Sequence, residues 1–320
     1  MNIADVLILG GGPTGLYAAY YAGLRGLTVE IIDSYPQLGG QLTTIYPEKF
    51  IYNVPGFVRI SAKDLAQNLV EQAMTNPPGT SLGQEIIDLS SRHEGDTAFF
   101  SLETKPEGKH YGKTLLMTAA PAMLTPRTLP LADALRLEGK GVSYIVTDKE
   151  QLRAKKVLVV GGGDSALDWV SGLIGHAKEV ILIHRGDVFT AHEESIKRLQ
   201  SLPVTVKLLT EIKAICGKKI VESVILRHNR TGVEEELAID AIVLKLGFLP
   251  SPIPPFSKWG LKIENDYVVV NTKMETSRAG IYAAGDVATY EGKVKLIVTG
   301  FGEAALAVNA IKEYLAGAQG

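Results

Sequence analysis

Cysteine is nearly absent from this sequence. The 320 residues include a single cysteine, Cys216, which excludes an intramolecular disulfide, a CxxC pair and a multi-cysteine metal site. Apolar and polar residues alternate around it in EIKAICGKKI, so we interpret Cys216 as a small packing residue on a strand, without a redox role. The six histidines do not form an HExxH pattern, and no metal site is predicted.

Long apolar runs and a strong charge of either sign are also missing. The apolar runs have the length of strands and are broken by glycines, so no membrane-spanning helix is predicted. The formal net charge of −2 gives no indication of a nucleic acid or an anionic membrane as partner. A predicted strand begins within a few residues of Met1 and leaves no room for a signal peptide. We therefore expect a cytoplasmic protein.

Patterns of strand and helix alternate along most of the chain. Such alternation predicts parallel βαβ units and an α/β fold. The predicted strands are 6–9, 28–32, 83–92, 98–104 and 113–119, and the predicted helices are 15–26 and 61–75. Proline-rich segments at 121–130 and 246–256 suit connectors between domains. We predict a first domain of residues 1–121 and 246–320, with a second domain, residues 122–245, inserted into it.

The first glycine-rich segment, DVLILGGGPTGLYAAYYA, begins at Asp5. Gly10, Gly12 and Gly15 form a GxGxxG pattern. The first glycine permits a tight turn, the second lets backbone approach a pyrophosphate, and the third allows close packing of helix on strand. The next predicted strand ends at Asp33, where a carboxylate can bind a ribose 2′-hydroxyl. Glycine-rich turns also occur for packing alone, but strand, helix and terminal acid in register favour a dinucleotide site.

A second segment, KVLVVGGGDSALDWV, repeats this layout in the middle of the chain. Gly161, Gly163 and Ala166 form the GxGxxA variant of the pattern. The following strand ends in His184 and Arg185 instead of an acid. A cation at this place suits the 2′-phosphate of NADP, which a carboxylate would repel. Alternatively, Arg185 is a solvated residue at the end of a strand.

A third element indicates which nucleotide the first loop binds. The short strand pattern in TSRAGIYAAGDVA ends in Gly285 and Asp286, and an acid at such a strand end can bind the ribityl chain of FAD. The helix pattern in GFGEAALAVNAIKEYL can direct its N-terminal dipole at the pyrimidine edge of a flavin, where reduction builds negative charge. Alternatively, Asp286 is a turn residue that follows glycine. We predict that the first loop binds FAD and the second NADP.

Across nearly its whole length the sequence resembles the flavin- and NADP-dependent pyridine nucleotide oxidoreductases with the thioredoxin-reductase fold. The resemblance rests on GGGPTGLYAAYYAGLRG, PQLGGQLTTIYPEKFIYNVPGF, GGGDSALDW, YAAGD and GFGEAA. The segments LGGQL, YPEK and TYEGKVKL are similar to one branch, the thioredoxin-reductase-like ferredoxin(flavodoxin)–NADP reductases of bacteria and archaea. The resemblance implies two Rossmann-like, three-layer nucleotide-binding domains, the second inserted in the first, and a homodimer.

Thioredoxin reductases of this family carry a CxxC pair just before the second glycine loop. Here Ile145 and Asp148 stand at those two positions, in GKGVSYIVTDKEQL, and neither side chain can form a disulfide. The dithiol route from flavin to thioredoxin is therefore predicted to be absent. Electrons must then leave directly from the flavin, which favours ferredoxin or flavodoxin as acceptor.

The resemblance also implies roles for individual residues. Tyr46 would stack on the isoalloxazine ring, Ile86 would present backbone to the adenine, and Leu124 would line the ring site. Without the GGQL before it, Tyr46 would be interpreted as a core tyrosine beside Pro47. The implied FAD-binding residues are Gly10, Gly12, Thr14, Gly15, Asp33, Gln41, Tyr46, Ile86, Leu124 and Asp286, and the implied NADP-binding residues are Gly161, Gly163, Asp164, Ser165 and Arg185.

Three departures from the family pattern change these expectations. Relatives carry HRRDxFRAHE, but here Gly186 and Thr190 replace two of the arginines, so Arg185 alone predicts a modest preference for NADPH over NADH. The connector TAxGxxxPR is TAAPAMLTPR here, and alanine in place of glycine can alter how backbone approaches the flavin. Relatives in the ferredoxin-reductase branch also continue past the last helix, with an extension that shields the flavin face. We expect this cover to be missing here or to come from elsewhere.

The sequence thus predicts a flavoenzyme that transfers electrons between NADP(H) and a one-electron carrier, ferredoxin or flavodoxin. Hydride transfer from NADPH to a flavin needs orientation and not an acid–base pair, so no catalytic side chain is predicted. Lys293 and Lys295 are expected to form a basic patch for an acidic carrier, unless they are simply solvated. Two alternatives remain, an NAD(P)H-dependent flavoenzyme with a quinone or O₂ as acceptor, and a flavin-binding protein without turnover.

Overall fold

The computed structural model describes residues 2–94, 97–119, 124–146, 148–250 and 256–317. The chain divides into two compact units, one formed by Met1–Met123 with Pro250–Gly320 and the other by Leu124–Leu249. At the junctions, the short strands β9 (Leu124–Pro126) and β18 (Phe248–Pro250) pair with each other. These divisions lie within a few residues of the predicted boundaries at 121/122 and 245/246. The remaining parts of the proline-rich connectors, 120–123 and 251–255, lie outside the described residues.

The first unit is built on a seven-stranded sheet whose central strands are parallel. β5, β2, β1, β8 and β21 run parallel, as βαβ units require, and β8 continues into an antiparallel meander with β7 and β6. The strand order is β5 (Gly79–Leu82), β2 (Val29–Asp33), β1 (Ala4–Leu9), β8 (Gly108–Met117), β7 (Thr97–Lys105) and β6 (Glu85–Glu94), with β21 (Ile281–Ala283) beside β8.

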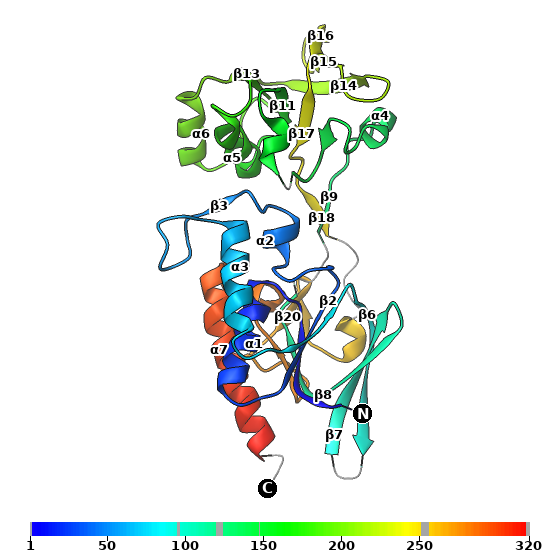
Figure 1. The fold of residues 1–320 in the computed structure, drawn as a ribbon, viewed down its shortest axis with the longest axis vertical. Helices are drawn as coiled ribbons and strands as arrows, with labels where there is room; N and C mark the ends of the chain where they lie inside the picture. Colours follow the sequence, from blue (N-terminus) through cyan, green and yellow to red (C-terminus); the bar gives the residue numbers. More distant parts are fainter. Residues whose placement is uncertain (1, 95–96, 120–123, 147, 251–255, 318–320) are drawn as a thin grey trace. The chain divides into compact units, whose positions relative to one another are not determined.

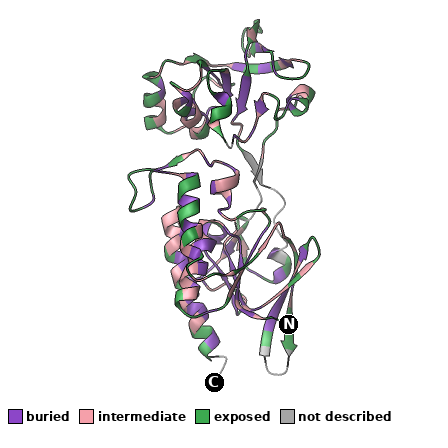
Figure 2. Ribbon diagram, in the orientation of Figure 1, coloured by how far each residue is buried: buried purple, intermediate pink, exposed green. Residues whose placement is uncertain are grey.

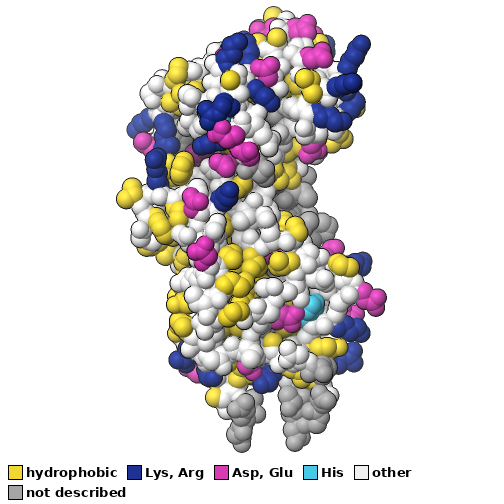
Figure 3. Space-filling model, in the orientation of Figure 1, with side chains coloured by type: hydrophobic (Ala, Val, Ile, Leu, Met, Phe, Trp, Pro, Cys, Tyr) yellow, Lys and Arg dark blue, Asp and Glu magenta, His cyan; other side chains and the backbone are white. Residues whose placement is uncertain are grey.

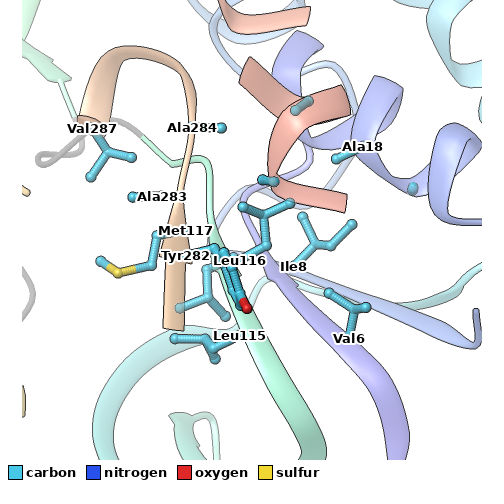
Figure 4. Close-up of a cluster of buried hydrophobic side chains, with 14 of the residues drawn as sticks. Val6, Ile8, Ala18, Leu115, Leu116, Met117, Tyr282, Ala283, Ala284 and Val287 are labelled. Carbon is cyan, nitrogen blue, oxygen red and sulfur yellow. The ribbon is translucent and has the colours of Figure 1, made fainter. Parts of the chain in front are cut away.

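Three helices of the first unit, α1 (Pro13–Leu24), α3 (Ala62–Ala73) and α7 (Ile297–Gly317), lie side by side, with α1 in contact with both others (Figure 1). Small buried residues of α1, such as Ala18, allow this close approach. Ser61 caps α3, because its side chain accepts a hydrogen bond from the Asp64 backbone nitrogen at 3.1 Å. Figure 4 shows Ala18 beside side chains of β1, β8 and β21 in the buried core.

Short elements complete the first unit around this sheet. A helical turn follows the second strand, and the small strands form a hairpin and a three-stranded sheet. The bounds are α2 (Gln41–Thr44), β3 (Phe50–Ile51), β4 (Ile60–Ser61), η2 (Phe256–Trp259), β19 (Ile263–Glu264), β20 (Tyr267–Val269), η3 (Gly285–Val287) and β22 (Ala288–Thr289).

The second unit has a five-stranded parallel sheet between two other layers. Val157 and Val159 of the central strand pack with α5, whereas Leu158 and Val160 pack toward an antiparallel sheet on the opposite face. The parallel order is β10 (Val142–Ser143), β17 (Ala241–Leu244), β11 (Lys156–Val160), β12 (Glu179–Ile183) and β13 (Thr205–Lys207). The other elements are α4 (Ala132–Arg136), η1 (Lys149–Leu152), α5 (Asp164–Leu173), α6 (Glu193–Gln200), β14 (Thr210–Cys216), β15 (Ser223–His228) and β16 (Glu234–Ala238).

The two units therefore have the α/β, Rossmann-like construction that the sequence predicts. Figure 2 shows buried residues along the central strands of each unit. Cys216 ends strand β14 and is half-buried. Among the described residues, no group of three or more histidine, cysteine, aspartate or glutamate side chains is placed to hold a metal ion. No described helix has the length and apolar character needed to cross a bilayer.

Candidate functional site

The first glycine loop joins β1 to α1. Gly10 has φ +112°, and a Cβ there would lie 2.6 Å from the Ala119 backbone nitrogen, so the tight turn requires glycine. A Cβ on Gly15 would overlap the Gly10 carbonyl oxygen, so α1 can pack on the turn only because residue 15 has no side chain. Protein geometry alone thus explains two of the three glycines.

Gly12 differs, because no described protein atom requires glycine there. A Cβ on Gly12 would meet only the Gly40 Cα, at 4.0 Å, and its φ of −77° is one that any residue adopts. Gly12 is the N-cap of α1, which has no side-chain cap and no acidic residue in its first turn. The first N–H groups of α1 and its positive dipole end therefore lie beside a residue without a side chain, an arrangement suited to a phosphate.

Asp33 ends β2 beside this loop. The side chain is 7% exposed, and desolvation raises the pKa of its carboxyl above the ordinary value, although backbone hydrogen bonds oppose that rise. Oδ2 accepts the Gly11 N–H at 2.5 Å, and Oδ1 accepts the Tyr35 N–H at 2.8 Å. Each carboxylate oxygen has a second lone pair, so Asp33 can still accept a hydroxyl hydrogen while it fixes the loop.

Residues 39–46 fold back onto the first loop. Gly39 and Gly40 have φ +107° and +57°, and the Gly39 N–H donates to the Gly11 carbonyl oxygen at 2.9 Å. A Cβ on Gly40 would lie 2.8 Å from the Gly12 Cα. These contacts place α2, which begins with the half-buried Gln41, directly against the loop.

Tyr46 and Asp286 are close enough to interact electrostatically. Burial, together with the nearby Asp286 carboxylate and Tyr35, raises the pKa of Tyr46 to about 12. Asp286 lies in η3 and is exposed, and no described residue hydrogen-bonds to its carboxylate. The structure thus brings an aromatic ring and a free carboxylate together.

Thr14 links the first loop to η3 and α7. A Cβ on Gly285 would lie 2.8 Å from Thr14 Oγ1, and Gly300 of α7 is crowded by the same hydroxyl. Ile86 lies on β6, half-buried against the core of the first unit. Leu124 begins β9 in the second unit, and its side chain falls outside the description.

A buried acid that the sequence analysis did not single out lies behind this site. Glu303 of α7 is 3% exposed. Its Oε2 accepts the Gly285 N–H at 2.7 Å, and its Oε1 accepts the Tyr290 hydroxyl at 2.6 Å and the Lys293 ammonium. Burial and the bond to Glu303 raise the pKa of Tyr290 to about 12. The signal in the sequence was a single acid among the buried alanines of α7. In the structure Glu303 holds the backbone of the turn that precedes Asp286.

The prediction that Lys293 and Lys295 form a basic patch is wrong for Lys293. The Lys293 side chain is 5% exposed and forms an ion pair with Glu303, so it offers no charge to a partner. The Lys293 ammonium is the counter-ion of Glu303, because burying a carboxylate without a counter-ion costs free energy. Lys295 is exposed and lies 3.3 Å from the centroid of the Tyr267 ring.

The second glycine loop repeats the geometry of the first. Gly161 has φ +155°, and a Cβ there would lie 2.5 Å from the Lys245 carbonyl oxygen. Gly163 is the N-cap of α5, and the nearest described atom to a Cβ there is Thr190 Oγ1 at 3.7 Å. As at Gly12, the glycine beside the helix N-terminus is not explained by protein contacts.

Asp164, Ser165 and Arg185 surround this loop in different ways. Asp164 accepts hydrogen bonds from the His192 N–H at 3.1 Å, His192 Nδ1 at 2.6 Å and Ser195 Oγ at 2.7 Å. These bonds outweigh desolvation and lower the pKa of Asp164, so its carboxylate anchors the start of α6. Ser165 and Arg185 are exposed, and no described acid pairs with the Arg185 guanidinium.

Ile145, one of the two positions of the missing dithiol, follows a residue whose carbonyl oxygen binds a half-buried lysine. Ile145 is half-buried, and Asp148 caps η1. Lys245 follows β17 and donates to the Tyr144 carbonyl oxygen at 3.1 Å, with Nζ 5.1 Å from the Trp169 ring centroid. Desolvation lowers the pKa of Lys245 to about 8. Nothing in the sequence pattern marked Lys245, since its burial depends on neighbours from α5 and the end of β10.

Comparison with known proteins places this geometry among oxidoreductases. The profile of the pyridine nucleotide-disulphide oxidoreductase family matches residues 4–313. The sequence is 43% identical to the ferredoxin–NADP reductase of Geobacillus kaustophilus, over 98% of this chain and 93% of the relative. It is 45% identical to that of Halalkalibacterium halodurans, over 98% and 94%. The structure resembles the thioredoxin reductase of T. acidophilum, with a TM-score of 0.77 and 25% sequence identity, over 98% of this chain and 99% of that one.

Proposed function

Because the chain belongs to the pyridine nucleotide-disulphide oxidoreductase family, we propose that it is a flavoenzyme that transfers electrons between NADP(H) and ferredoxin or flavodoxin. The observation that carries the proposal is the pair Ile145 and Asp148 before the second glycine loop. A chain with two nucleotide loops and no dithiol cannot pass electrons through a disulfide of its own. The ferredoxin–NADP reductases at 43% and 45% identity support the same acceptor class.

We assign FAD to the unit that contains the first loop. The residues there fit such a group, because Gly12 leaves space beside uncapped N–H groups and Asp33 retains lone pairs for a ribose hydroxyl. Bound FAD would supply the exchange between a hydride from NADPH and single electrons for the carrier. The proposed FAD-binding residues are Gly10, Gly12, Thr14, Gly15, Asp33, Gln41, Tyr46, Ile86, Leu124 and Asp286.

The chain itself contributes binding and orientation. With a pKa of about 12, Tyr46 stays protonated at neutral pH and can offer an uncharged aromatic face to a flat ring. Glu303 fixes the backbone of Gly285, so the neighbouring Asp286 carboxylate is held in place for hydroxyl groups of the ligand. Neither role needs a proton to move, in keeping with a site that orients a cofactor and has no acid–base pair.

We assign NADP(H) to the unit that contains the second loop. Gly163 leaves space at the N-terminus of α5 for a pyrophosphate, and the exposed Arg185 at the end of β12 can approach a 2′-phosphate. The proposed NADP-binding residues are Gly161, Gly163, Asp164, Ser165 and Arg185.

The segment 293–295, where the carrier was expected to dock, offers it one exposed lysine. Lys293 is committed to Glu303, which leaves Lys295 as the exposed cation of that segment. On the face shown in Figure 3, Lys and Arg side chains are interspersed with Asp and Glu. Charge on that face therefore does not single out one surface for an acidic protein.

The cofactor assignment predicts a yellow protein with roughly one FAD per chain. Asp286→Ala should lower FAD retention, because it removes an exposed carboxylate that accepts no hydrogen bond from a described residue. Asp88→Ala, an exposed aspartate on β6, is the matched control and should retain FAD. Fluorescence titration of the apoproteins measures both affinities. Equal affinity in the two variants would remove Asp286 from the site.

The acceptor assignment predicts NADPH-dependent reduction of ferredoxin or flavodoxin, and no thiol formation with oxidised thioredoxin. Steady-state turnover with both carriers, thioredoxin and a quinone tests it, with a dithiol thioredoxin reductase as positive control. Thiol formation above the enzyme-free rate would overturn the proposal. Turnover with the quinone or O₂ alone would favour an enzyme with another acceptor, and a flavin that NADPH does not reduce would indicate a protein without turnover.

A further inference from the structure

The segment after β12, residues 184–190, carries Gly186 and Thr190 where the family pattern has arginines. A Cβ on Gly186 would lie 2.8 Å from Nε2 of His184, so a longer side chain there would have to displace that ring. Thr190 is bound to the glycine loop, with its N–H and Oγ1 donating to the Gly162 carbonyl oxygen at 2.8 and 3.2 Å. Arg185 is thus the only cation that the described part of this segment, 184–190, contributes.

A turn from a different part of the second unit brings another cation to the same place. Arg230, between β15 and β16, lies 2.9 Å from the Asp187 carboxylate. The neighbouring Asn229 donates from Nδ2 to the Arg185 carbonyl oxygen at 3.0 Å. Asn229 also donates its backbone N–H to the Leu209 carbonyl oxygen at 2.6 Å. The turn is therefore tied to the two residues that flank Gly186.

The backbone of this turn is fixed by its own hydrogen bonds. His228 Nδ1 accepts the N–H groups of Arg230 at 3.3 Å and Thr231 at 3.2 Å, and the Gly232 N–H donates to the His228 carbonyl oxygen at 2.8 Å. The Arg230 side chain remains 68% exposed. A rigid base thus presents a guanidinium that ligands can reach.

We propose that Arg230 binds the 2′-phosphate of NADP(H) together with Arg185, an inference that rests on the proposed function. A guanidinium has five N–H donors. Only one nitrogen of Arg230, Nη2, donates to Asp187, and it donates to one carboxylate oxygen, Oδ2. An exposed ion pair contributes little stability, so Arg230 can share its donors with a phosphate at low cost. A phosphate monoester carries a charge of about −1.5 to −2 at neutral pH and matches the planar fork of arginine.

Asp187 makes Arg230 doubly important. Its carboxylate stands two residues after Arg185 and would repel a 2′-phosphate if it were not paired. Arg230 therefore removes an unfavourable charge and adds favourable donors at one place. This device replaces the arginines that relatives carry on the segment itself, so NADPH preference can be stronger than Arg185 alone predicts.

The test compares two adenine nucleotides that differ only in the 2′-phosphate. We expect Arg230→Ala to weaken binding of adenosine 2′,5′-bisphosphate by about ten- to hundredfold and to leave binding of 5′-AMP unchanged, by calorimetry on the flavin-loaded protein. Arg227→Ala, an exposed arginine on β15, is the matched control and should change neither. The ratio of kcat/KM for NADPH over NADH should fall by a similar factor in Arg230→Ala.

A second variant separates direct contact from removal of the Asp187 charge. If Arg230 contacts the phosphate, Asp187→Asn combined with Arg230→Ala should still bind the bisphosphate weakly. Recovery of wild-type affinity in the double variant, or equal losses for both nucleotides in Arg230→Ala, would overturn the proposal. Failure of the wild type to bind either nucleotide would instead contradict the proposed function, so the two failures are distinguishable.

Discussion

Gly12→Ala is expected to leave the apoprotein folded and to weaken FAD binding by about ten- to hundredfold. The added Cβ would meet only the Gly40 Cα, at 4.0 Å, so the protein itself has room for it. A pyrophosphate that approaches the backbone of Gly12 would lose that room, and such overpacking costs about 1–3 kcal/mol. Fluorescence titration of the apoprotein with FAD measures the loss, and urea unfolding of the apoprotein measures its stability.

Gly15→Ala adds the same methyl group a few residues later and should behave in the opposite way. Its Cβ would overlap the Gly10 carbonyl oxygen, so α1 must move and the free energy of unfolding of the apoprotein should fall. Gly79→Ala, on β5 with contacts no closer than 3.6 Å, is the control and should change neither quantity. Wild-type FAD affinity in Gly12→Ala would show that the pyrophosphate lies elsewhere.

The glycine loops could be predicted from sequence because local rules determine them. Gly10 and Gly161 need positive φ, and each follows a buried parallel strand, which depends only on a short stretch of chain. The position of Asp33 follows from the same βαβ geometry. The predicted domain boundaries lie within a few residues of the unit boundaries, because proline-rich connectors interrupt the alternation of strands and helices.

The residues whose roles the sequence analysis missed or misjudged depend on contacts between distant segments. Arg230 reaches Asp187 only because the turn after β15 returns to the end of β12, and Lys293 is buried only because α7 places Glu303 behind it. From sequence, TYEGKVKL has the composition of an exposed loop, and the pattern does not distinguish a paired lysine from a solvated one. Asp164 was expected to contact the nucleotide. Its hydrogen bonds with His192 and Ser195 join segments distant in sequence, so the sequence pattern could not predict them.

The buried ion pair of the first unit should have a large effect when it is broken. Lys293 and Glu303 are 5% and 3% exposed, and removing one partner of such a pair leaves a charge in a poorly solvated place. We expect Lys293→Met to lower the free energy of unfolding of the apoprotein by about 3–5 kcal/mol. Lys295→Met, which alters an exposed lysine of the same segment, is the matched control and should change it by less than about 1 kcal/mol.

Replacing both partners separates the unpaired charge from simple loss of packing. In Lys293→Met combined with Glu303→Gln, the amide oxygen can still accept the Gly285 N–H, and no ionised group is left without a partner, so more than half of the lost stability should return. FAD affinity should follow stability, because Glu303 holds the backbone next to Asp286. Urea unfolding and FAD titration of all four proteins decide the matter. If Lys293→Met is as stable as Lys295→Met, the pair does not support this turn.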